Sequence, residues 1–196
     1  MYKLKLTDIY KQLKEEEATP TEPAQQYKIY CDMDGVIADF DKRFKDVNPE
    51  KLSAAQYQTK YGIEKFWDLI DEENKVKFWV GIPWMSDGKQ LWDYIKEYNP
   101  YVLTAPSVNM NIPFEDRYKL DNNESMQGKT EWVQRLPNAR KVYFRSAARK
   151  ADFAGPNKIL IDDRADTIQK WRDAGGIGIL HKNATDTIQQ LKDLGL

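Results

Sequence analysis

The chain has 196 residues, a formal net charge of −1 and a pI near 6.0, so no overall charge would attract nucleic acid or an anionic membrane. No apolar run approaches the ~20 residues of a membrane-spanning helix, and the N-terminus lacks a signal-peptide pattern. The single cysteine, Cys31, excludes an intrachain disulfide and suits a reducing compartment, so we expect a cytoplasmic protein.

Residues 1–26 are expected to lie at the periphery of the fold. Apolar residues recur there at roughly helical spacing: Leu4, Leu6, Ile9, Tyr10 and Leu13. The stretch 19–23 (TPTEP) has the composition of a linker. We therefore expect an amphipathic helix tethered to the body, where it either packs on the body or docks a partner.

The stretch 28–40 (KIYCDMDGVIADF) opens with an apolar run that predicts a buried strand. Asp32 and Asp34 follow this run, and Gly35 breaks the pattern. Two carboxylates at the end of a buried strand are costly unless a cation lies between them, and Mg²⁺ is the simplest such cation. The alternatives are a plain Asp-Gly turn and an EF-hand loop, which fits less well because Gly35 directly follows the second aspartate.

Residues 41–88 are rich in Trp, Phe, Lys and Glu, and they show no clear strand. The pattern after Asp39 predicts helices, including two over 52–57 and 63–71. Aromatic side chains at helical spacing usually form a core. We therefore expect a helical insert whose rings pack together.

The rest of the chain alternates helices with continuous apolar strands. Strands are predicted at 101–103, 141–144, 158–161 and 177–181, and helices at 90–98, 129–136, 165–174 and 185–194. Residues 107–127 are polar and lack a period, which indicates a lid or a mobile loop. This alternation predicts an α/β, Rossmann-like fold: a mostly parallel sheet with helices on both faces. Its core domain comprises residues 27–40 and 89–196, and a small helical cap, residues 41–88, is inserted after the first strand.

Polar side chains follow several of the predicted strands. They are Asp32 and Asp34 after the first, Thr104 after the second, the cations Arg145, Arg149 and Lys150 after the third, and Asp162 and Asp163 after the fourth. Ligands bind at the carboxyl ends of the strands in open α/β sheets, so we expect these groups to converge there.

Such a group of side chains suits phosphoryl transfer. Asp32 is the natural nucleophile because a carboxylate can attack phosphorus and form an aspartyl-phosphate. Asp34 is placed to protonate the leaving oxygen and then to activate water, which requires a raised pKa. Asp162, the Asp32 side chain and the backbone carbonyl of Asp34 would hold Mg²⁺, while Asp163 would bind through water or orient a lysine.

The remaining polar groups would bind the phosphoryl oxygens. Thr104 and the N–H of Ala105 would donate hydrogen bonds to them. Lys150 would neutralise the charge that develops on the phosphoryl group and would shield Asp32 from its like-charged neighbours.

Four motifs of this chain match, in order, those of the haloacid dehalogenase-like (HAD) superfamily. They are DMDGV (32–36), LTAP (103–106), a lysine near 150 and LIDDR (160–164). Within the superfamily, DMDGVIADF, the aromatic insert, KTEWV (129–133) and LIDDR resemble the 5′(3′)-deoxyribonucleotidases and their bacterial and phage relatives. The resemblance implies a Rossmann-like core with a helical cap, Mg²⁺ as cofactor and nucleoside monophosphates as substrates. It also implies Asp32 as nucleophile, Asp34 as acid and base, Asp162 as metal ligand and Thr104 as phosphate ligand.

The sequence departs from the family pattern at three points. Ala105 stands where those nucleotidases commonly have serine, and the loop 107–127 looks longer. Lys150, Arg149 and Arg145 compete for the basic roles, and we favour Lys150 as the catalytic lysine. We expect Lys129 and Arg145 to contact substrate. Three rings of the cap, Phe44, Trp67 and Trp79, have two possible roles: at least one of them stacks on a nucleobase, or all three only pack the cap helices together.

The leading hypothesis is thus a Mg²⁺-dependent phosphatase that acts on nucleoside monophosphates through an aspartyl-phosphate. A second hypothesis moves the chemistry to phosphorylated nucleic-acid ends or to another small phosphometabolite. The pI and the lack of a basic run argue against nucleic acid, although 140–150 offers a local patch. A third is a non-enzymatic binding protein that docks through its N-terminal helix. We expect a small phosphate monoester as partner, and no membrane.

Overall fold

The structure is a computed structural model that describes residues 27–72, 75–107 and 123–196. Its centre is a five-stranded sheet in the order β3-β2-β1-β4-β5, and every pair of neighbouring strands is parallel. The strands are β1 (Lys28–Cys31), β2 (Tyr101–Thr104), β3 (Val142–Phe144), β4 (Lys158–Asp162) and β5 (Ile177–Leu180). The predicted parallel sheet is confirmed, and β1 lies at its centre.

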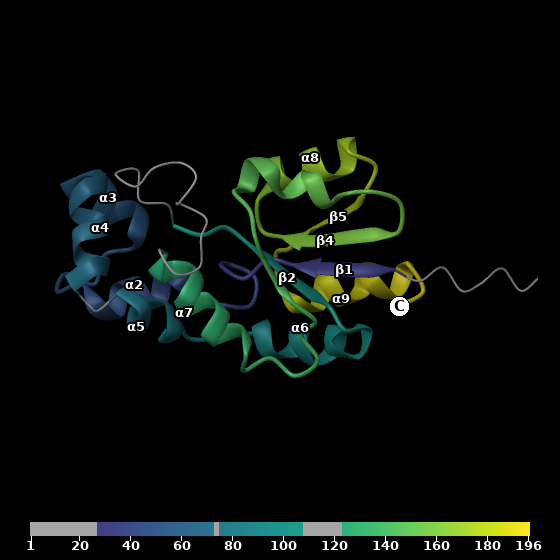
Figure 1. Ribbon diagram of the computed structural model, residues 1–196, viewed down its shortest axis with the longest axis horizontal. Coiled ribbons are helices and arrows are strands. Elements are labelled where there is room, and N and C mark those ends of the chain that lie inside the picture. Colours follow the sequence, from purple (N-terminus) through teal and green to yellow (C-terminus); the bar gives the residue numbers. More distant parts are fainter. Residues whose placement is uncertain (1–26, 73–74, 108–122) are drawn as a thin grey trace, which may run out of the picture.

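Helices cover both faces of this sheet (Figure 1). Helix α8 (Ala165–Asp173) lies on one face, and α6 (Gly88–Ile95) and α9 (Ala184–Asp193) lie on the other. The arrowheads of β1 and β4 point toward the helical insert, residues 40–80, at the left of Figure 1. The carboxyl ends of the strands therefore face the insert.

Each face of the sheet has its own apolar core, which explains the continuous apolar runs in the sequence. In β1, Ile29 and Cys31 point to the face that α6 and α9 cover, and both are buried. Tyr30 points to the other face, where it meets Trp171 of α8 at 5.5 Å between ring centroids. Because both faces are buried, a strand such as β1 cannot alternate apolar with polar residues.

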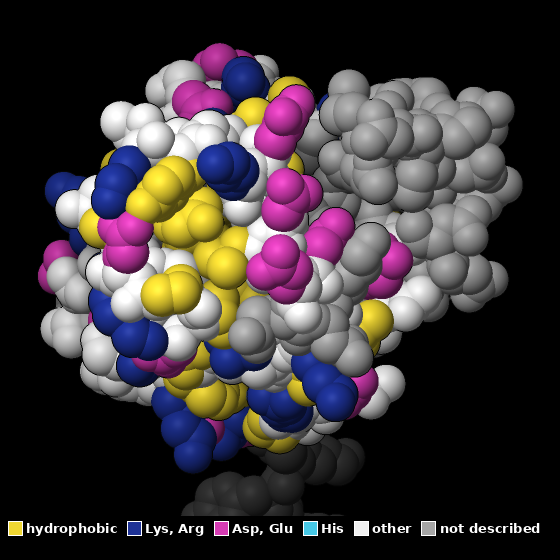
Figure 2. Space-filling view, turned by 90° about the vertical axis from the view of Figure 1, so that its left-hand side faces the viewer, with side chains coloured by type: hydrophobic (Ala, Val, Ile, Leu, Met, Phe, Trp, Pro, Cys, Tyr) yellow, Lys and Arg dark blue, Asp and Glu magenta, His cyan; other side chains and the backbone are white. Residues whose placement is uncertain are grey.

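The insert is built around packed aromatic rings, as its sequence predicts. Its helices are α2 (Phe40–Val47), α3 (Ala54–Tyr61), α4 (Ile63–Glu72) and α5 (Lys75–Val80). Phe44 is fully buried and stacks on Phe66 at 4.7 Å. Asn48 is also fully buried and joins α2 to the next segment, since its side-chain amide donates to the carbonyls of Phe44 and Leu52. Figure 2, which looks at this end of the molecule, shows apolar side chains among both signs of charge.

The structure corrects the predicted boundaries of one helix. Helix α7 spans Glu124–Val133, so residues 124–127 of the predicted loop are helical and the predicted start at Lys129 is wrong. Asn123 caps the helix by accepting a hydrogen bond from the N–H of Met126 at 3.0 Å. The face of α7 that is buried includes the polar residues Ser125 and Lys129. A buried polar face hides the apolar period on which the prediction depends.

Two sequence predictions fall outside the described residues: the N-terminal amphipathic helix and most of the loop 107–127. The division of the chain into core and cap domains stays a prediction. In the described part of the chain, no helix is both long and apolar enough to cross a bilayer.

Candidate active site

The carboxylates of Asp32 and Asp162 meet at the carboxyl ends of the neighbouring strands β1 and β4. Both residues are buried, and Asp162 has no exposed surface. Asp32 Oδ1 accepts a hydrogen bond from the N–H of Met33 at 2.7 Å, and Asp162 Oδ1 accepts one from the N–H of Arg164 at 2.9 Å. The strand order reverses here, because β2 and β3 are added on one side of β1 while β4 and β5 lie on its other side. Open α/β sheets bind ligands at such a point.

Lys150 bridges these two aspartates. It lies in a short 3₁₀ segment (Ala147–Phe153), and only 2% of its side chain is exposed. Its Nζ lies 2.7 Å from Asp32 Oδ2 and 2.7 Å from Asp162 Oδ2. Burial alone would lower the pKa of Lys150, but the two carboxylates outweigh it and the pKa is raised. A permanent positive charge therefore lies between the predicted nucleophile and the predicted metal ligand.

Asp163 completes a group of three carboxylates. One oxygen from each of Asp32, Asp162 and Asp163 lies within 4.8 Å of the others. Burial and the charge of Asp32 raise the pKa of Asp162 to about 6, and the same two causes raise the pKa of Asp163. Lys150 compensates only part of this negative charge. A set of hard carboxylate oxygens with excess negative charge fits Mg²⁺.

Gly35 makes room for Asp163. Its φ is +78°, and a Cβ at this position would lie 2.9 Å from the carboxyl carbon of Asp163. Only glycine adopts this backbone conformation readily. The requirement for glycine at position 35 thus has two separate causes: the positive φ of the backbone turn and the space that the Asp163 carboxylate occupies.

The substitution Gly35→Ala should separate these two causes. Gly62 is a matched control, because its φ is +88° and a Cβ added there would meet nothing within 4 Å among the described residues. Both alanine variants should lose about 1–2 kcal/mol of unfolding free energy through backbone strain. The Asp163 carboxylate is partly buried but has enough exposed surface to rotate away, so Gly35→Ala should additionally weaken Mg²⁺ binding by about tenfold or more. Chemical denaturation and Mg²⁺ titration measure the two effects, and equal Mg²⁺ affinity in both variants would contradict the second cause.

Asp34 has a lysine partner of its own, Lys129. Lys129 is 1% exposed, and its ammonium group pairs with Asp34 Oδ2. The same Nζ donates to Thr104 Oγ1 at 3.2 Å and to the carbonyl of Ala105 at 2.7 Å. The carboxylates of Asp32 and Asp34 therefore pair with two different buried lysines: Lys150 pairs with Asp32, and Lys129 pairs with Asp34.

Close packing of α7 on α5 puts Lys129 in this place. A Cβ on Gly128 would lie 2.5 Å from Trp79 Cβ and 2.7 Å from the carbonyl of Val76, so only glycine permits this approach. The ammonium of Lys129 then lies 5.0 Å from the centroid of the Trp79 ring. Such cation–π contacts stabilise a desolvated ammonium group.

One oxygen of Asp34 is left without a partner among the described residues. Oδ1 is buried, and no group in that part of the chain hydrogen-bonds to it. Burial raises the pKa of Asp34 and the charge of Asp32 adds to this, while Lys129 opposes both. A buried carboxylate oxygen without a partner is costly, so a substrate group or a water molecule is expected to occupy the space beside it.

The structure places the other predicted residues in different surroundings. Arg145 is exposed over the ring of Phe153 at 5.3 Å, and Arg149 pairs with Asp152 at 2.9 Å, so of the three competing basic residues Lys150 alone reaches Asp32. In the cap, Phe44 has no exposed surface, so its ring has no free face for a nucleobase. This geometry corrects the stacking prediction for Phe44, because burial against other rings uses its whole surface.

The two tryptophans differ from Phe44. Trp79 is 4% exposed and lies beside Lys129, while Trp67 is partly exposed and packs edge-on against Phe66 at 4.8 Å. A stacking role for either tryptophan stays a prediction.

The indirect role predicted for Asp163 stays a prediction, and the structure places one of its carboxylate oxygens within 4.8 Å of oxygens of Asp32 and Asp162. Sequence reasoning missed one feature of the site, because it gave Lys129 a substrate contact without its pairing to Asp34. The unusual lysine on the buried face of α7 is the signal that could have found the pairing, because a buried lysine needs a charged partner.

No protein-family model and no curated protein matches the sequence. Solved structures do match the fold. A HAD-superfamily hydrolase of subfamily IA, variant 1, from Geobacter sulfurreducens PCA superposes with a TM-score of 0.51 at 10% identity, over 88% of this chain and all of its own. A hydrolase from Streptococcus pneumoniae TIGR4 gives 0.49 at 14% identity, over 85% and 99%. The Geobacter comparison supports the Rossmann-like parallel α/β fold.

Proposed function

We propose that this chain is a Mg²⁺-dependent phosphomonoesterase of the HAD type that acts on nucleoside monophosphates. The proposal depends above all on the pairing of Asp32 with Lys150 and of Asp34 with Lys129. The two carboxylates lie two residues apart, yet each has its own environment. Because their surroundings differ, one carboxylate can attack phosphorus while the other transfers a proton.

Asp32 would act as the nucleophile. Its carboxylate oxygen forms a bond to phosphorus while the bond from phosphorus to the ester oxygen breaks. Asp34, whose Oδ1 has no partner among the described residues, would give its proton to the leaving oxygen. Lys150 already contacts Asp32 and would neutralise charge on the phosphoryl group, and Thr104 would hold a phosphoryl oxygen.

Hydrolysis of the aspartyl-phosphate would complete the cycle. Asp34 takes a proton from water, the water oxygen bonds to phosphorus, and the bond from phosphorus to Asp32 breaks. Inorganic phosphate leaves, and both carboxyl groups return to their starting protonation states. Asp32, Asp162 and Asp163 would hold Mg²⁺, which supplies charge stabilisation for the phosphoryl oxygens when it is bound.

Nucleotide substrates are proposed from the resemblance of DMDGVIADF, KTEWV and LIDDR to the deoxyribonucleotidases, together with the aromatic cap. The placement of Trp79 next to Lys129 supports an aromatic wall beside the site. Fold alone does not choose a substrate.

A phosphate-release screen tests the proposal. The panel holds dUMP, dTMP, other nucleoside monophosphates and sugar phosphates, each with Mg²⁺ and with EDTA. We expect turnover of nucleoside monophosphates that EDTA abolishes and excess Mg²⁺ restores. Turnover of sugar phosphates alone would contradict the nucleotide assignment, and no turnover across the panel would contradict the phosphatase itself.

Mg²⁺ should also stabilise the fold in a pH-dependent way. A ligand at one hundred times its Kd adds about 2.7 kcal/mol to the unfolding free energy. The raised pKa values of Asp162 and Asp163 mean that protons compete with Mg²⁺ at acidic pH. We therefore expect a larger Mg²⁺-induced rise in melting temperature at pH 7.5 than at pH 5.0. Scanning fluorimetry measures this, and the Asp162→Asn variant should show little rise at either pH.

A further inference from the structure

Three cations surround the edge strand β3, and each lies over an aromatic ring. The guanidinium of Arg140 lies 5.5 Å from the ring centroid of Tyr101, and the guanidinium of Arg145 lies 5.3 Å from that of Phe153. The ammonium of Lys141 lies 5.0 Å from the ring centroid of Tyr143. We call these six residues the basic–aromatic surface.

The rings belong to one face of the sheet. Tyr101 and Tyr143 are neighbours there at 5.6 Å between centroids, and Tyr143 meets Phe153 at 4.9 Å. Helix α8 covers this face over β4 and β5 (Figure 1). Tyr101 on β2 and Tyr143 on β3 are partly exposed, whereas Tyr30 on the central strand is buried. The surface therefore lies on the less covered half of the face.

The positive charge of this surface is uncompensated within the described part of the chain. Arg140, Lys141 and Arg145 are exposed, and within the described residues none of them forms an ion pair with a carboxylate. The stretch 132–151 carries six basic residues and no acidic one: Arg135, Arg140, Lys141, Arg145, Arg149 and Lys150. Arg149 pairs with Asp152, and Lys150 with Asp32 and Asp162, so the other four carry the local excess of positive charge among the described residues. In a chain of net charge −1, this local excess favours an anionic partner.

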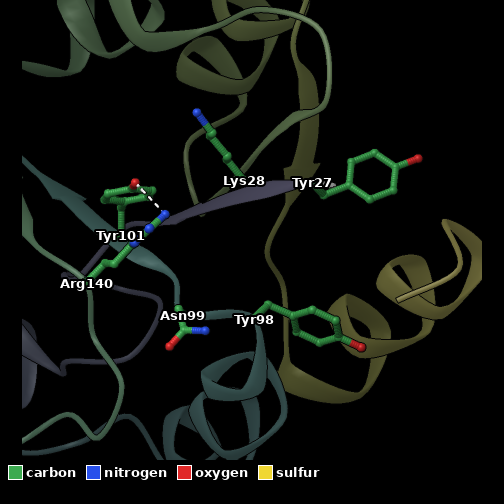
Figure 3. A pocket seen from close by; sticks show the side chains of 6 residues that line it. All are labelled: Tyr27, Lys28, Tyr98, Asn99, Tyr101 and Arg140. Carbon is green, nitrogen blue, oxygen red and sulfur yellow. Dashed lines mark hydrogen bonds between the residues drawn. The ribbon is translucent and has the colours of Figure 1, made fainter. Parts of the chain in front are cut away.

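A pocket adjoins the surface at the amino ends of the strands. It has a volume of about 380 Å³ and is lined by Tyr27, Lys28, Tyr98, Asn99, Tyr101 and Arg140 (Figure 3). Arg140 donates a hydrogen bond to the hydroxyl of Tyr101 at 3.0 Å, and Lys28 adds a second cation. The pocket thus repeats the combination of cations and rings.

The other end of the surface reaches the catalytic edge of the sheet. The N–H of Arg145 donates to the carbonyl of Thr104 at 3.0 Å, and the hydroxyl of Thr104 contacts Lys129. The basic–aromatic surface therefore extends from the pocket at the amino ends of the strands to the carboxyl edge of the sheet, where the proposed phosphatase site lies.

We propose that the basic–aromatic surface binds single-stranded nucleic acid. Its cations would contact successive phosphates, and the exposed guanidinium planes of Arg140 and Arg145, which lie over rings, would stack on unpaired bases. A planar cation can both pair with a phosphate and stack on a base, whereas an acidic peptide offers carboxylates but no bases. If the proposed phosphatase function holds, the surface would present a terminal phosphate of the strand to Asp32.

Fluorescence anisotropy with a labelled, unphosphorylated twelve-nucleotide DNA strand tests the binding without any need for catalysis. The test variant is Arg140→Glu/Lys141→Glu. The control is Lys65→Glu/Lys192→Glu, which makes the same charge change at exposed lysines that each lie 5.9 Å from a tyrosine ring centroid elsewhere. Circular dichroism checks that both variants are folded.

We expect the wild type and the control to bind, with an affinity that falls as salt rises. The test variant should bind at least about tenfold more weakly, with a shallower salt dependence because each lost phosphate contact removes about 0.7 from the slope. Equal weakening in test and control variants would overturn the proposal, as would a lack of binding by the wild type at low salt. A test variant that changes only the sedimentation coefficient would overturn it in favour of contact with a second copy. Nucleotide turnover in the screen above is scored separately, so the two proposals can fail independently.

Discussion

Replacement of Asp32 by Asn should lower phosphate release from a nucleoside monophosphate by about 10⁴-fold or more, the scale seen when a catalytic nucleophile is removed. The amide cannot form the aspartyl-phosphate, and neither Asp162 nor Asp163 is free to replace it if both hold Mg²⁺. The loss should appear in kcat. Steady-state kinetics measure it, and mass spectrometry of the wild type quenched during turnover should find a phosphoryl group on Asp32.

The fold should survive this substitution. Asp32 is one of three neighbouring carboxylates, so its neutralisation relieves repulsion and lowers the pKa of Asp162 toward its ordinary value. Asp166→Asn is the control, because Asp166 is an exposed carboxylate paired with Arg164 at 3.2 Å. It should keep full activity. Retained turnover in Asp32→Asn would contradict the assignment of the nucleophile, whatever its stability.

Replacement of Lys150 by Met should destabilise the protein by about 3–5 kcal/mol, because it leaves two buried carboxylates without their cation. The side chains of Asp32 and Asp162 are 8% and 0% exposed, so water cannot take over the role of the lysine. Chemical denaturation measures the change without added Mg²⁺. Lys170→Met is the control. Its half-exposed partner Asp166 lies 3.9 Å away, and its loss should cost at most about 1 kcal/mol.

A double variant separates charge from packing. If the cost of Lys150→Met comes from uncompensated carboxylates, then Asp32→Asn should stabilise the Lys150→Met variant by clearly more than it stabilises the wild type. If the cost comes from a lost side-chain volume, the two substitutions should add. Additive effects would therefore contradict the electrostatic account of this site.

The strands could be predicted from sequence because each is a short apolar run with a clear end. The run Lys28–Cys31 is both the predicted and the observed first strand. The core residues of both sheet faces lie in such runs, and parallel pairing follows from the alternation with helices. Convergence of Asp32 with Asp162 also follows, because neighbouring parallel strands bring their carboxyl ends to one edge.

The helix α7 shows where this reasoning stops. Its buried face contains Ser125 and Lys129, so the sequence lacks the apolar period that marks a helix start. The buried face of this helix is polar because it lies beside the candidate site. Local sequence rules fail most readily at such places, because the side chains are selected for contacts with residues far away in the chain.

The sequence by itself determined the parallel α/β fold, the helical insert and the set of acidic strand ends, since these depend on periodicity and chain order. The tertiary structure alone decided how charges are shared: Lys150 with Asp32 and Asp162, and Lys129 with Asp34. It also decided that Phe44 is enclosed while Arg140 and Lys141 remain open to solvent. Ion pairing and exposure depend on distances between segments far apart in the chain, and no local pattern contains those distances.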